Sequence, residues 1–463
     1  MQGNENKDLG TGNIGRLLLS LSIPAITAQV INLLYNMVDR MYIGHIRDIG
    51  SEALTGVGVS FPIIMIIAAF ASLVGMGGAP RASIMLGKGD KPAAEKILGN
   101  CVTVLTVISI VLTVVIQIFK QQFLMMFGAS DQTIGYGEQY LTIYSLGTLF
   151  VQYALGLNMF ITCQGFAKTS MLTVVIGAVL NIILDPIFIF VFDMGVQGAA
   201  LATIISQAVS AFWVMKFLLG KKTTLKITRK DLAPKLHVIL PVLALGVSPF
   251  IMQSTESLLF VCLNSSLQKY GGDIAVGAMT ILSSVMQFAM MPIQGLTQGA
   301  QPIISYNFGA RKIDRVSKAF QLLLIYALVF SGVIWLAVML APQLFAGLFT
   351  NDQALIDYAA GALRVYFAMG IVLGAQIACQ QTFIALGNAK ISVFLAVFRK
   401  IILLIPLIFI FPLFMEDKVF AIFVAEPVAD TLAVAATVTM FTISFQRLLK
   451  KYRTADLTAG KKE

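Results

Sequence analysis

The stretch ILGNCVTVLTVISIVLTVVIQIF, residues 97–119, decides the fold class because it runs for twenty-three residues without a charged side chain. A helix that crosses the hydrocarbon core of a bilayer needs about 20 mainly apolar residues. The apolar residues follow one another without the strict alternation of a transmembrane β-strand. The stretch therefore predicts a membrane-spanning α-helix.

Similar apolar runs, separated by short polar connectors, fill the rest of the chain. We expect twelve transmembrane helices near residues 17–44, 52–79, 97–119, 140–163, 170–192, 197–219, 237–265, 274–304, 317–341, 358–386, 391–414 and 419–446. The composition agrees, since 57% of the 463 residues are hydrophobic and 12% are charged. Soluble domains carry about 45–50% apolar and about 25% charged residues. The sequence predicts an all-α polytopic membrane protein.

Basic residues are distributed unevenly over the connectors, and they explain the net charge of +10. With twelve helices, 25 of the 33 Lys and Arg residues lie on one predicted face. The opposite face holds Arg47, Lys120, Lys269 and Lys418. Cytoplasmic loops are enriched in Lys and Arg, so both termini should be cytoplasmic. Nucleic-acid binding is not needed to explain the charge, and the polar N-terminus does not resemble a secretory signal peptide.

An internal repeat appears when the sequence is compared with itself at an offset of 222 residues. The offset aligns Gly77 with Gly299, Gly87 with Gly309, Lys96 with Lys318, Tyr144 with Tyr366, and 165–168 with 387–390. Six helices per half give both halves the same orientation in the membrane. We expect a cytoplasmic N-terminus (1–16), an N-lobe (17–219), a flexible basic cytoplasmic linker (220–236), a C-lobe (237–446) and a basic cytoplasmic tail (447–463).

Polar residues inside the first predicted helix share one face. Gln29, Asn32, Asn36 and Asp39 follow at spacings of three, four and three residues. They line either a substrate cavity or an interhelical polar contact, and Asp39 could instead pair with Arg40. Pro24 near the helix start removes a backbone hydrogen bond and predicts a gating kink.

The fifth predicted helix carries Asn181 and Asp185 at i and i+4. An ionisable group inside the membrane costs roughly 2.5–3.5 kcal/mol on insertion scales, so it usually has a function. A carboxylate and an amide oxygen are ligands for a hard cation such as Na⁺. Asn158 and Thr203 on neighbouring helices either complete the oxygen shell with Asp39 or form hydrogen bonds that join helices. A hydrogen bond that packs helices around Pro186 is the alternative.

Candidate polar residues also lie in the second half of the chain. Glu256 is a carboxylate within the seventh helix and a candidate cation or proton site. The predicted cavity wall consists of Gln253, Gln287, Met291, Gln294 and Gln376. Helix packing is the alternative for these residues. Glu426 and Asp430 are expected to pair with Arg399 or Lys400, and their role stays open.

The energy source can be narrowed by motifs. No GxxxxGK[ST] sequence is present, so ATP-driven transport by this chain has no support. The four cysteines lie in apolar runs without a CxxC pair, and only two histidines occur. We therefore expect no cofactor and a coupling ion, H⁺ or Na⁺, with Na⁺ bound at Asp39, Asn181 and Asp185.

The run AQPIISYNFGA at residues 300–310 resembles the loop after the eighth helix of multidrug and toxic compound extrusion (MATE) transporters. Pro24, Asp39 and Gly44, the sequence NIILDP in the fifth helix, and Glu256 resemble that family too. The resemblance covers nearly the whole chain. It implies cation-coupled efflux of cationic amphiphilic compounds across the bacterial plasma membrane.

The family resemblance also implies site residues. An N-lobe cation site of some members matches Asp39, Asn158, Asn181, Asp185 and Thr203. Other members use a C-lobe Glu, matched by Glu256, with an Asp on the tenth helix. Residues 365–386 contain no Asp or Glu, so the second pattern is incomplete.

The sequence thus predicts a secondary active multidrug antiporter, not an enzyme, that works as a monomer by alternating access of its two lobes. A flippase for lipid-linked precursors is the nearest alternative, but it should have a strongly basic cavity. A membrane-embedded transferase should show a metal-binding carboxylate cluster such as DDxxD or a catalytic pair that contains a His, and neither occurs. The substrate and the choice between H⁺ and Na⁺ cannot be read from the sequence.

Overall fold

A computed structural model describes residues 9–46 and 49–459, and Arg47 lies outside this part of the chain. Within it, nine helices are long and apolar enough to cross a membrane. One of them, α9, crosses twice because its backbone is non-helical at Gly272, with φ of 64°. Two bent helix pairs pass the same test when each pair is taken together. The described residues thus form the twelve predicted crossings.

The N-lobe comprises the elements before residue 220. These are α1 (Ile14–Gly44), α2 (Gly50–Gly87), α3 (Lys91–Met126), α4 (Ile134–Leu146), α5 (Thr148–Gln152), η1 (Tyr153–Leu157), α6 (Asn158–Thr162), α7 (Ala167–Pro186), η2 (Ile187–Val191) and α8 (Gly195–Leu219). Helix η1 and helix η2 are π-helical turns. The fourth crossing bends by 62° between α4 and α5.

The C-lobe comprises the elements after the linker, which contains the short η3 (Arg229–Asp231). They are α9 (Leu236–Gly309), α10 (Ile313–Leu340), α11 (Pro342–Gly347), α12 (Gln353–Tyr366), α13 (Gly370–Ala385), α14 (Ala389–Val397), η4 (Phe398–Leu404), α15 (Ile405–Phe414) and α16 (Lys418–Ala459). The tenth crossing bends by 51° between α12 and α13. Helix α16 continues well past the predicted boundary at residue 446 because its polar end extends beyond the apolar run.

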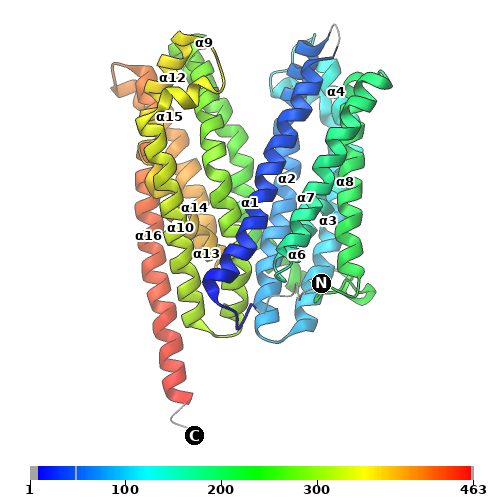
Figure 1. The fold of residues 1–463 in the computed structure, drawn as a ribbon, viewed down its shortest axis with the longest axis vertical. Helices are drawn as coiled ribbons and strands as arrows, with labels where there is room; N and C mark the ends of the chain where they lie inside the picture. The colour runs from blue at the N-terminus through cyan, green and yellow to red at the C-terminus, as the bar shows by residue number, and fades with distance from the viewer. Residues whose placement is uncertain (1–8, 47–48, 460–463) are drawn as a thin grey trace.

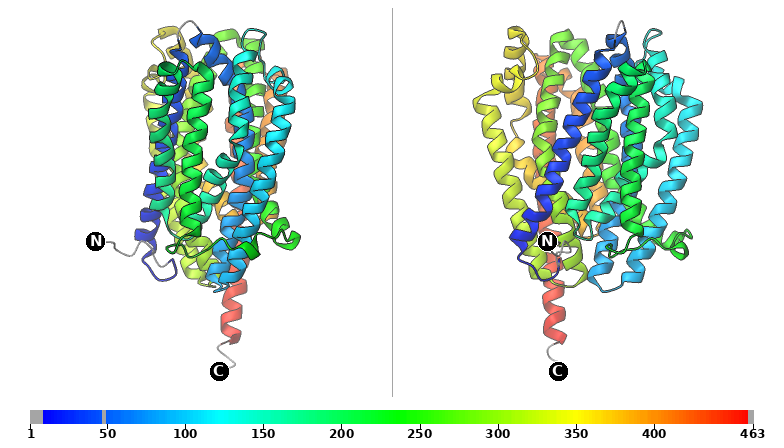
Figure 2. Two further views of the ribbon diagram at one scale, coloured as in Figure 1. Left: turned by 90° about the vertical axis from the view of Figure 1, so that its right-hand side faces the viewer. Right: turned by 45° about the vertical axis from the view of Figure 1, so that its right-hand side comes forward.

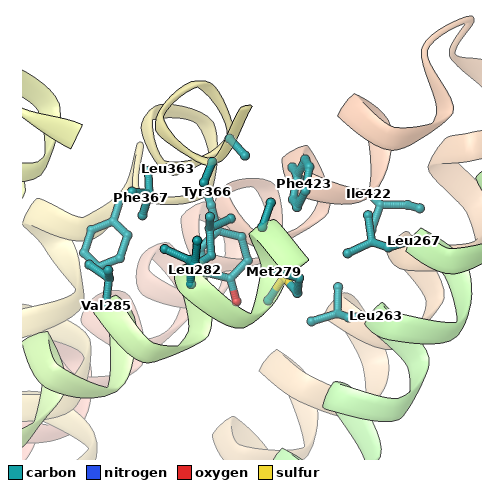
Figure 3. Packing of buried hydrophobic residues seen from close by; sticks show 14 of the residues in the cluster. Leu263, Leu267, Met279, Leu282, Val285, Leu363, Tyr366, Phe367, Ile422 and Phe423 are labelled. Carbon is teal, nitrogen blue, oxygen red and sulfur yellow. The ribbon is translucent and has the colours of Figure 1, made fainter. Parts of the chain in front are cut away.

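The two lobes stand side by side, and both described chain ends lie toward the same end of the molecule (Figures 1 and 2). We call this the terminal end and the opposite one the distal end. The ribbons of the lobes approach each other at the terminal end and diverge at the distal end (Figure 1). Each lobe has apolar clusters of its own, and Figure 3 shows Leu282, Tyr366 and Phe367 in the largest C-lobe cluster.

Glycines allow the lobes to touch backbone to backbone near the terminal end. A β-carbon on Gly87 would collide with the carbonyl oxygen of Tyr306, and one on Gly309 would collide with that of Ile84. Gly246 abuts the carbonyl group of Leu73 in the same way. A larger side chain at these positions would push the helices apart, because packed backbones leave no space for added atoms.

Hydrogen bonds reinforce this interlobe contact. Ser83 Oγ donates to the carbonyl of Pro302 at 3.4 Å, and Ser22 Oγ donates to that of Leu296 at 3.3 Å. All four residues lie in the parts of α1, α2 and α9 nearest the terminal end. The lobes are therefore joined at that end.

The start of the N-lobe is clamped onto the C-lobe. Asn307 Nδ2 donates to the carbonyl of Leu9 at 2.8 Å. Arg315 Nη2 donates to the carbonyls of Leu9 and Gly12, at 3.2 and 2.8 Å. Lys312 Nζ donates to the carbonyl of Gly10 at 2.9 Å. These bonds hold residues 9–12 against the end of α9 and the start of α10.

The linker was predicted to be flexible, and this prediction is wrong because residues 223–225 are hydrogen-bonded to the N-lobe. Gln164 Oε1 accepts hydrogen bonds from Thr223 Oγ1 and from the backbone N–H groups of Thr224 and Leu225, at 2.8–2.9 Å. Leu225 is fully buried. A basic composition suggested a mobile loop, but one buried amide and one buried leucine fix this segment to the N-lobe.

Candidate functional site

Three helices of the N-lobe bring together four of the predicted cation-site residues. Asn181 Nδ2 lies 3.2 Å from Asp185 Oδ1 and 3.3 Å from Thr203 Oγ1. The carboxyl group of Asp39 lies close enough to that of Asp185 for their charges to interact. Helix α1 supplies Asp39, α7 supplies Asn181 and Asp185, and α8 supplies Thr203. The i, i+4 spacing on α7 places its two side chains on one face.

Three oxygen atoms of this cluster have no hydrogen-bond partner. Asp39 Oδ1, Asn181 Oδ1 and Asp185 Oδ2 are buried and unpartnered within the part of the chain that the structure describes. Buried polar atoms are normally paired, so three unpaired acceptors at one place require a physical reason. A bound cation or proton would satisfy them.

The chemistry of the donor set fits a small cation. Carboxylate, amide and hydroxyl oxygens are hard ligands, and carboxylates balance a positive charge. Two carboxylates in close contact also repel each other when both are ionised, so uptake of one H⁺ would relieve the same strain. The arrangement therefore suits Na⁺ and H⁺ alike.

Tyrosines, which were not predicted as site residues, surround this cluster. Tyr35, Tyr140 and Tyr144 lie close enough to Asp39 to interact with its charge. The rings of Tyr140 and Tyr144 stack with centroids 5.8 Å apart. One signal for these tyrosines was present in the sequence, the alignment of Tyr144 with Tyr366 in the internal repeat.

Asn158, the fifth residue of the implied cation site, makes its hydrogen bonds elsewhere. Its Nδ2 donates to the carbonyl of Ser170 at 3.2 Å, and its Oδ1 accepts from Thr173 Oγ1 at 3.1 Å. Thr173 precedes Asn181 by eight residues on the same helix, which is about 12 Å along its axis. In this structure Asn158 joins α6 to the start of α7.

The predicted cavity residues of α1 and α9 continue a line of close helix contacts. Gly299 packs on Ser22, and Gly295 packs on Ile26. Because the residue numbers rise along α1 and fall along α9, the two helices run antiparallel. Beyond Ile26, side chains on both helices become accessible to solvent. These accessible or partly accessible residues are Gln29, Asn32, Asn36, Gln287, Met291 and Gln294. They lie where the two helices part.

Pro24, Gln253 and Gln376 occupy different surroundings. Pro24 is buried within α1, which continues as one helix on both sides of it. Gln253 Oε1 accepts a hydrogen bond from Ser72 Oγ of the N-lobe at 2.9 Å. Gln376 is buried in α13, and its Oε1 has no partner among the described residues. A gating role for Pro24 stays a prediction.

A second charged cluster lies in the C-lobe. Arg399 Nε lies 2.7 Å from Asp430 Oδ1, and Arg399 Nη2 lies 3.3 Å from Glu426 Oε1. The expected pairing of these two acids with Arg399 is thus confirmed. Lys400 instead pairs with Glu256. Arg40 lies over the ring of Phe61, 4.7 Å from its centroid, and not in an ion pair with Asp39.

Twelve crossings in two related lobes, with a buried oxygen cluster inside one of them, define a polytopic membrane transporter architecture. The MatE family model matches residues 24–187 and 249–410, one stretch in each lobe. The chain belongs to the MatE family and is a MATE transporter, not an enzyme.

Known relatives cover most of the chain. It is 26% identical over 395 residues to the multidrug export protein MepA of Staphylococcus aureus (strain N315), which covers 85% of this chain and 86% of the relative. Against MepA of Staphylococcus haemolyticus (strain JCSC1435) it is 26% identical over 423 residues, 91% of this chain and 92% of the relative. An outward-facing multidrug resistance MATE family transporter of the MOP superfamily superposes with a TM-score of 0.89 at 22% identity, covering 97% and 99% of the two chains.

Proposed function

We propose that this chain is a secondary active antiporter that exports cationic or amphiphilic organic compounds in exchange for H⁺ or Na⁺. The observation that carries the proposal is the set of three buried, unpartnered oxygens on Asp39, Asn181 and Asp185. A coupling ion that binds there would gain roughly 2.3 kcal/mol per charge per 100 mV of membrane potential. The relatives named as multidrug export proteins support the substrate class.

Transport would proceed by alternating access of the two lobes. The glycine contacts and hydrogen bonds join the lobes at the terminal end, and the ribbons diverge toward the distal end (Figure 1). We place the terminal end in the cytoplasm of a bacterium because the basic connectors follow the positive-inside rule. This state is then outward-facing, and ion binding at Asp39 on α1 would favour release of the compound and return of the carrier.

The substrate would bind between the lobes. The candidate residues are those that become accessible on both helices beyond the contact of Gly295 with Ile26, namely Gln29, Asn32 and Asn36 of α1 and Gln287, Met291 and Gln294 of α9. Amide and thioether side chains adapt to many shapes, as expected of a permissive binding surface. We propose a monomer in the plasma membrane with no cofactor, whose partners are small organic compounds and the bilayer.

The test is dye efflux from proteoliposomes that contain Asp39→Asn, Asp185→Asn or wild-type protein. Each substitution keeps the shape of the side chain and removes its charge, so gradient-driven efflux should be lost in both variants. Asp131→Asn is the matched control, because Asp131 is an exposed residue outside the cluster. Wild-type efflux in both Asp39→Asn and Asp185→Asn would refute coupling at this site.

The coupling ion is identified by imposing one gradient at a time. A proton gradient and a Na⁺ gradient are applied to separate batches of the same proteoliposomes, and dye efflux is followed in each. Efflux that responds to one gradient, and only while Asp39 and Asp185 are intact, identifies the ion. Efflux driven by neither gradient would exclude antiport.

A further inference from the structure

The charged cluster of the C-lobe is the structural counterpart of the cation cluster of the N-lobe. Counted with its tyrosines, the first cluster is built on crossings one (α1), four (α4), five (α7) and six (α8). Counted with Tyr366, the second is built on crossings seven (the first half of α9), ten (α12), eleven (η4) and twelve (α16). Tyr144 and Tyr366, which the repeat aligns, each lie beside the carboxylates of their own lobe. The ring of Tyr366 lies among the apolar side chains of the C-lobe core (Figure 3).

The two clusters differ in how their negative charge is balanced. Two carboxylates of the N-lobe cluster, Asp39 and Asp185, have no ion pair with Lys, Arg or His among the described residues. Three carboxylates of the C-lobe cluster are all paired, Glu256 with Lys400 and the other two with Arg399. Among the described residues, basic side chains thus balance the carboxylates of the C-lobe cluster, whereas none is paired with the carboxylates of the N-lobe cluster.

Unpartnered oxygens show the same contrast. The N-lobe cluster contains three buried oxygens without a hydrogen-bond partner. Among the described residues, no carboxylate oxygen of Glu256, Glu426 or Asp430 is in that condition. An unpaired buried acceptor is costly. Of the two clusters, the N-lobe cluster is therefore the one whose oxygens are available to bind an ion.

Lys400 is held as an ion would be held. Its side chain is 5% exposed, whereas that of its partner Glu256 is 66% exposed. The Lys400 ammonium also donates to the carbonyl of Met252 at 2.9 Å. A carboxylate and a backbone carbonyl thus bind one positive charge, and both are oxygen ligands of the kind that hard cations take in proteins.

Glu256 connects this site to the region between the lobes. Gln253, one helical turn earlier, accepts its hydrogen bond from Ser72 of the N-lobe, so this face of α9 points across to the other lobe. The exposed fraction of Glu256 places its carboxylate at the surface of that region, with the buried Lys400 behind it. An ion arriving between the lobes would therefore meet Glu256 first.

We propose that Lys400 is a tethered cation that occupies the C-lobe counterpart of the N-lobe ion site, so that the chain has one exchangeable cation site and not two. A covalently attached ammonium has a high effective concentration at Glu256, so free Na⁺ or H⁺ does not displace it. Removal of the ammonium should open a second site. This inference rests on the proposed ion binding at Asp39 and Asp185.

The test counts cations bound per chain in purified full-length protein. Bound Na⁺ is counted with radioactive Na⁺ at mildly alkaline pH. Bound H⁺ is counted from the number of protons that each variant takes up when the solution is acidified, compared between variants. Wild type should bind one cation, which Asp39→Asn with Asp185→Asn removes. Lys400→Met should bind two, a twofold rise. The double variant Lys400→Met/Glu256→Gln should return to one, and Lys400→Arg should stay at one.

The outcomes separate this inference from the proposed function. A wild-type chain that binds two cations, one of them lost in Glu256→Gln, would overturn the tethered-cation role. So would a Lys400→Met protein that binds no more than the double variant, if a thermal unfolding transition shows both to be folded. A wild-type chain whose binding ignores Asp39 and Asp185 would defeat the proposed function, and the comparison between the two Lys400→Met proteins would still decide the inference.

Discussion

Gly87 and Gly309 are separated by the repeat offset of 222 residues, and each lies against a backbone carbonyl of the opposite lobe. Their partners, Ile84 and Tyr306, are also separated by 222 residues. The contact between the lobes therefore obeys the same twofold relationship as the sequence. Glycine is required on both sides because the approach of two helix backbones leaves no space for a β-carbon.

We expect Gly309→Ala to destabilise the closed terminal end. The added methyl group would strike the carbonyl oxygen of Ile84, and overpacking of this kind typically costs about 1–3 kcal/mol. The unfolding temperature in detergent should fall, and dye efflux should slow. Gly58→Ala is the control, because nothing lies within 4 Å of a β-carbon there. Equal unfolding temperatures for the two variants would show that the contact is not tight.

Asn181 and Asn158 should respond differently to replacement by alanine. Loss of Asn181 removes an oxygen ligand and the hydrogen bonds to Asp185 and Thr203, so ion affinity should fall by about 1.4 kcal/mol or more, roughly tenfold. Asn158→Ala should lower stability through its lost bonds to Ser170 and Thr173 but leave ion affinity unchanged. Efflux measured against the driving ion's concentration gives both affinities, and equal losses would place Asn158 in the ion site.

Arg399→Met should be strongly destabilising. It leaves Glu426 and Asp430 buried without their cation, and breaking a buried ion pair costs about 3–5 kcal/mol. Adding Glu426→Gln and Asp430→Asn should recover most of the lost stability, because the cluster is then neutral. Arg364→Met, at an exposed arginine, is the control for thermal unfolding. A triple variant no more stable than Arg399→Met would argue against charge imbalance as the cause.

Replacement of Gln164 should release the linker. Gln164→Ala leaves the backbone N–H groups of Thr224 and Leu225 without their acceptor, a loss of about 1–3 kcal/mol for a buried group, whereas the Thr223 hydroxyl can still donate to the carbonyl of Leu225. Trypsin should then cut faster at Lys221, Lys222 or Lys226, as followed by gel electrophoresis. Gln268→Ala, which removes an exposed amide hydrogen-bonded to Asp273, is the control. Unchanged digestion would mean that other contacts hold the linker.

The membrane fold could be predicted from the sequence because hydropathy is a local property. Runs such as residues 97–119 identify crossings without knowledge of their neighbours. The helix ends were less predictable, since α3 begins at Lys91, in a polar segment that hydropathy does not detect. The bend between α4 and α5 was not predicted either, because it depends on packing around Gly147, whose β-carbon would collide with Ile204.

The candidate site was predictable where rare residues carried it. Charged groups are costly inside a membrane, and this made Asp39 and Asp185 stand out. The tyrosines around them did not, because aromatic residues are common in apolar helices. The pairing of Lys400 with Glu256 joins residues 144 positions apart, and no spacing rule connects two such helices.

The clamp on residues 9–12 also bears on how the protein is made. Leu9 is hydrogen-bonded by Asn307 and Arg315, which follow it by 298 and 306 residues. At about 5–20 residues per second, a ribosome reaches these partners roughly 15–60 s after it has made Leu9. The first lobe must therefore enter the bilayer before the bonds of Leu9 to Asn307 and Arg315 can form. The contacts between the lobes at the terminal end can be completed only after the eighth crossing has been synthesised.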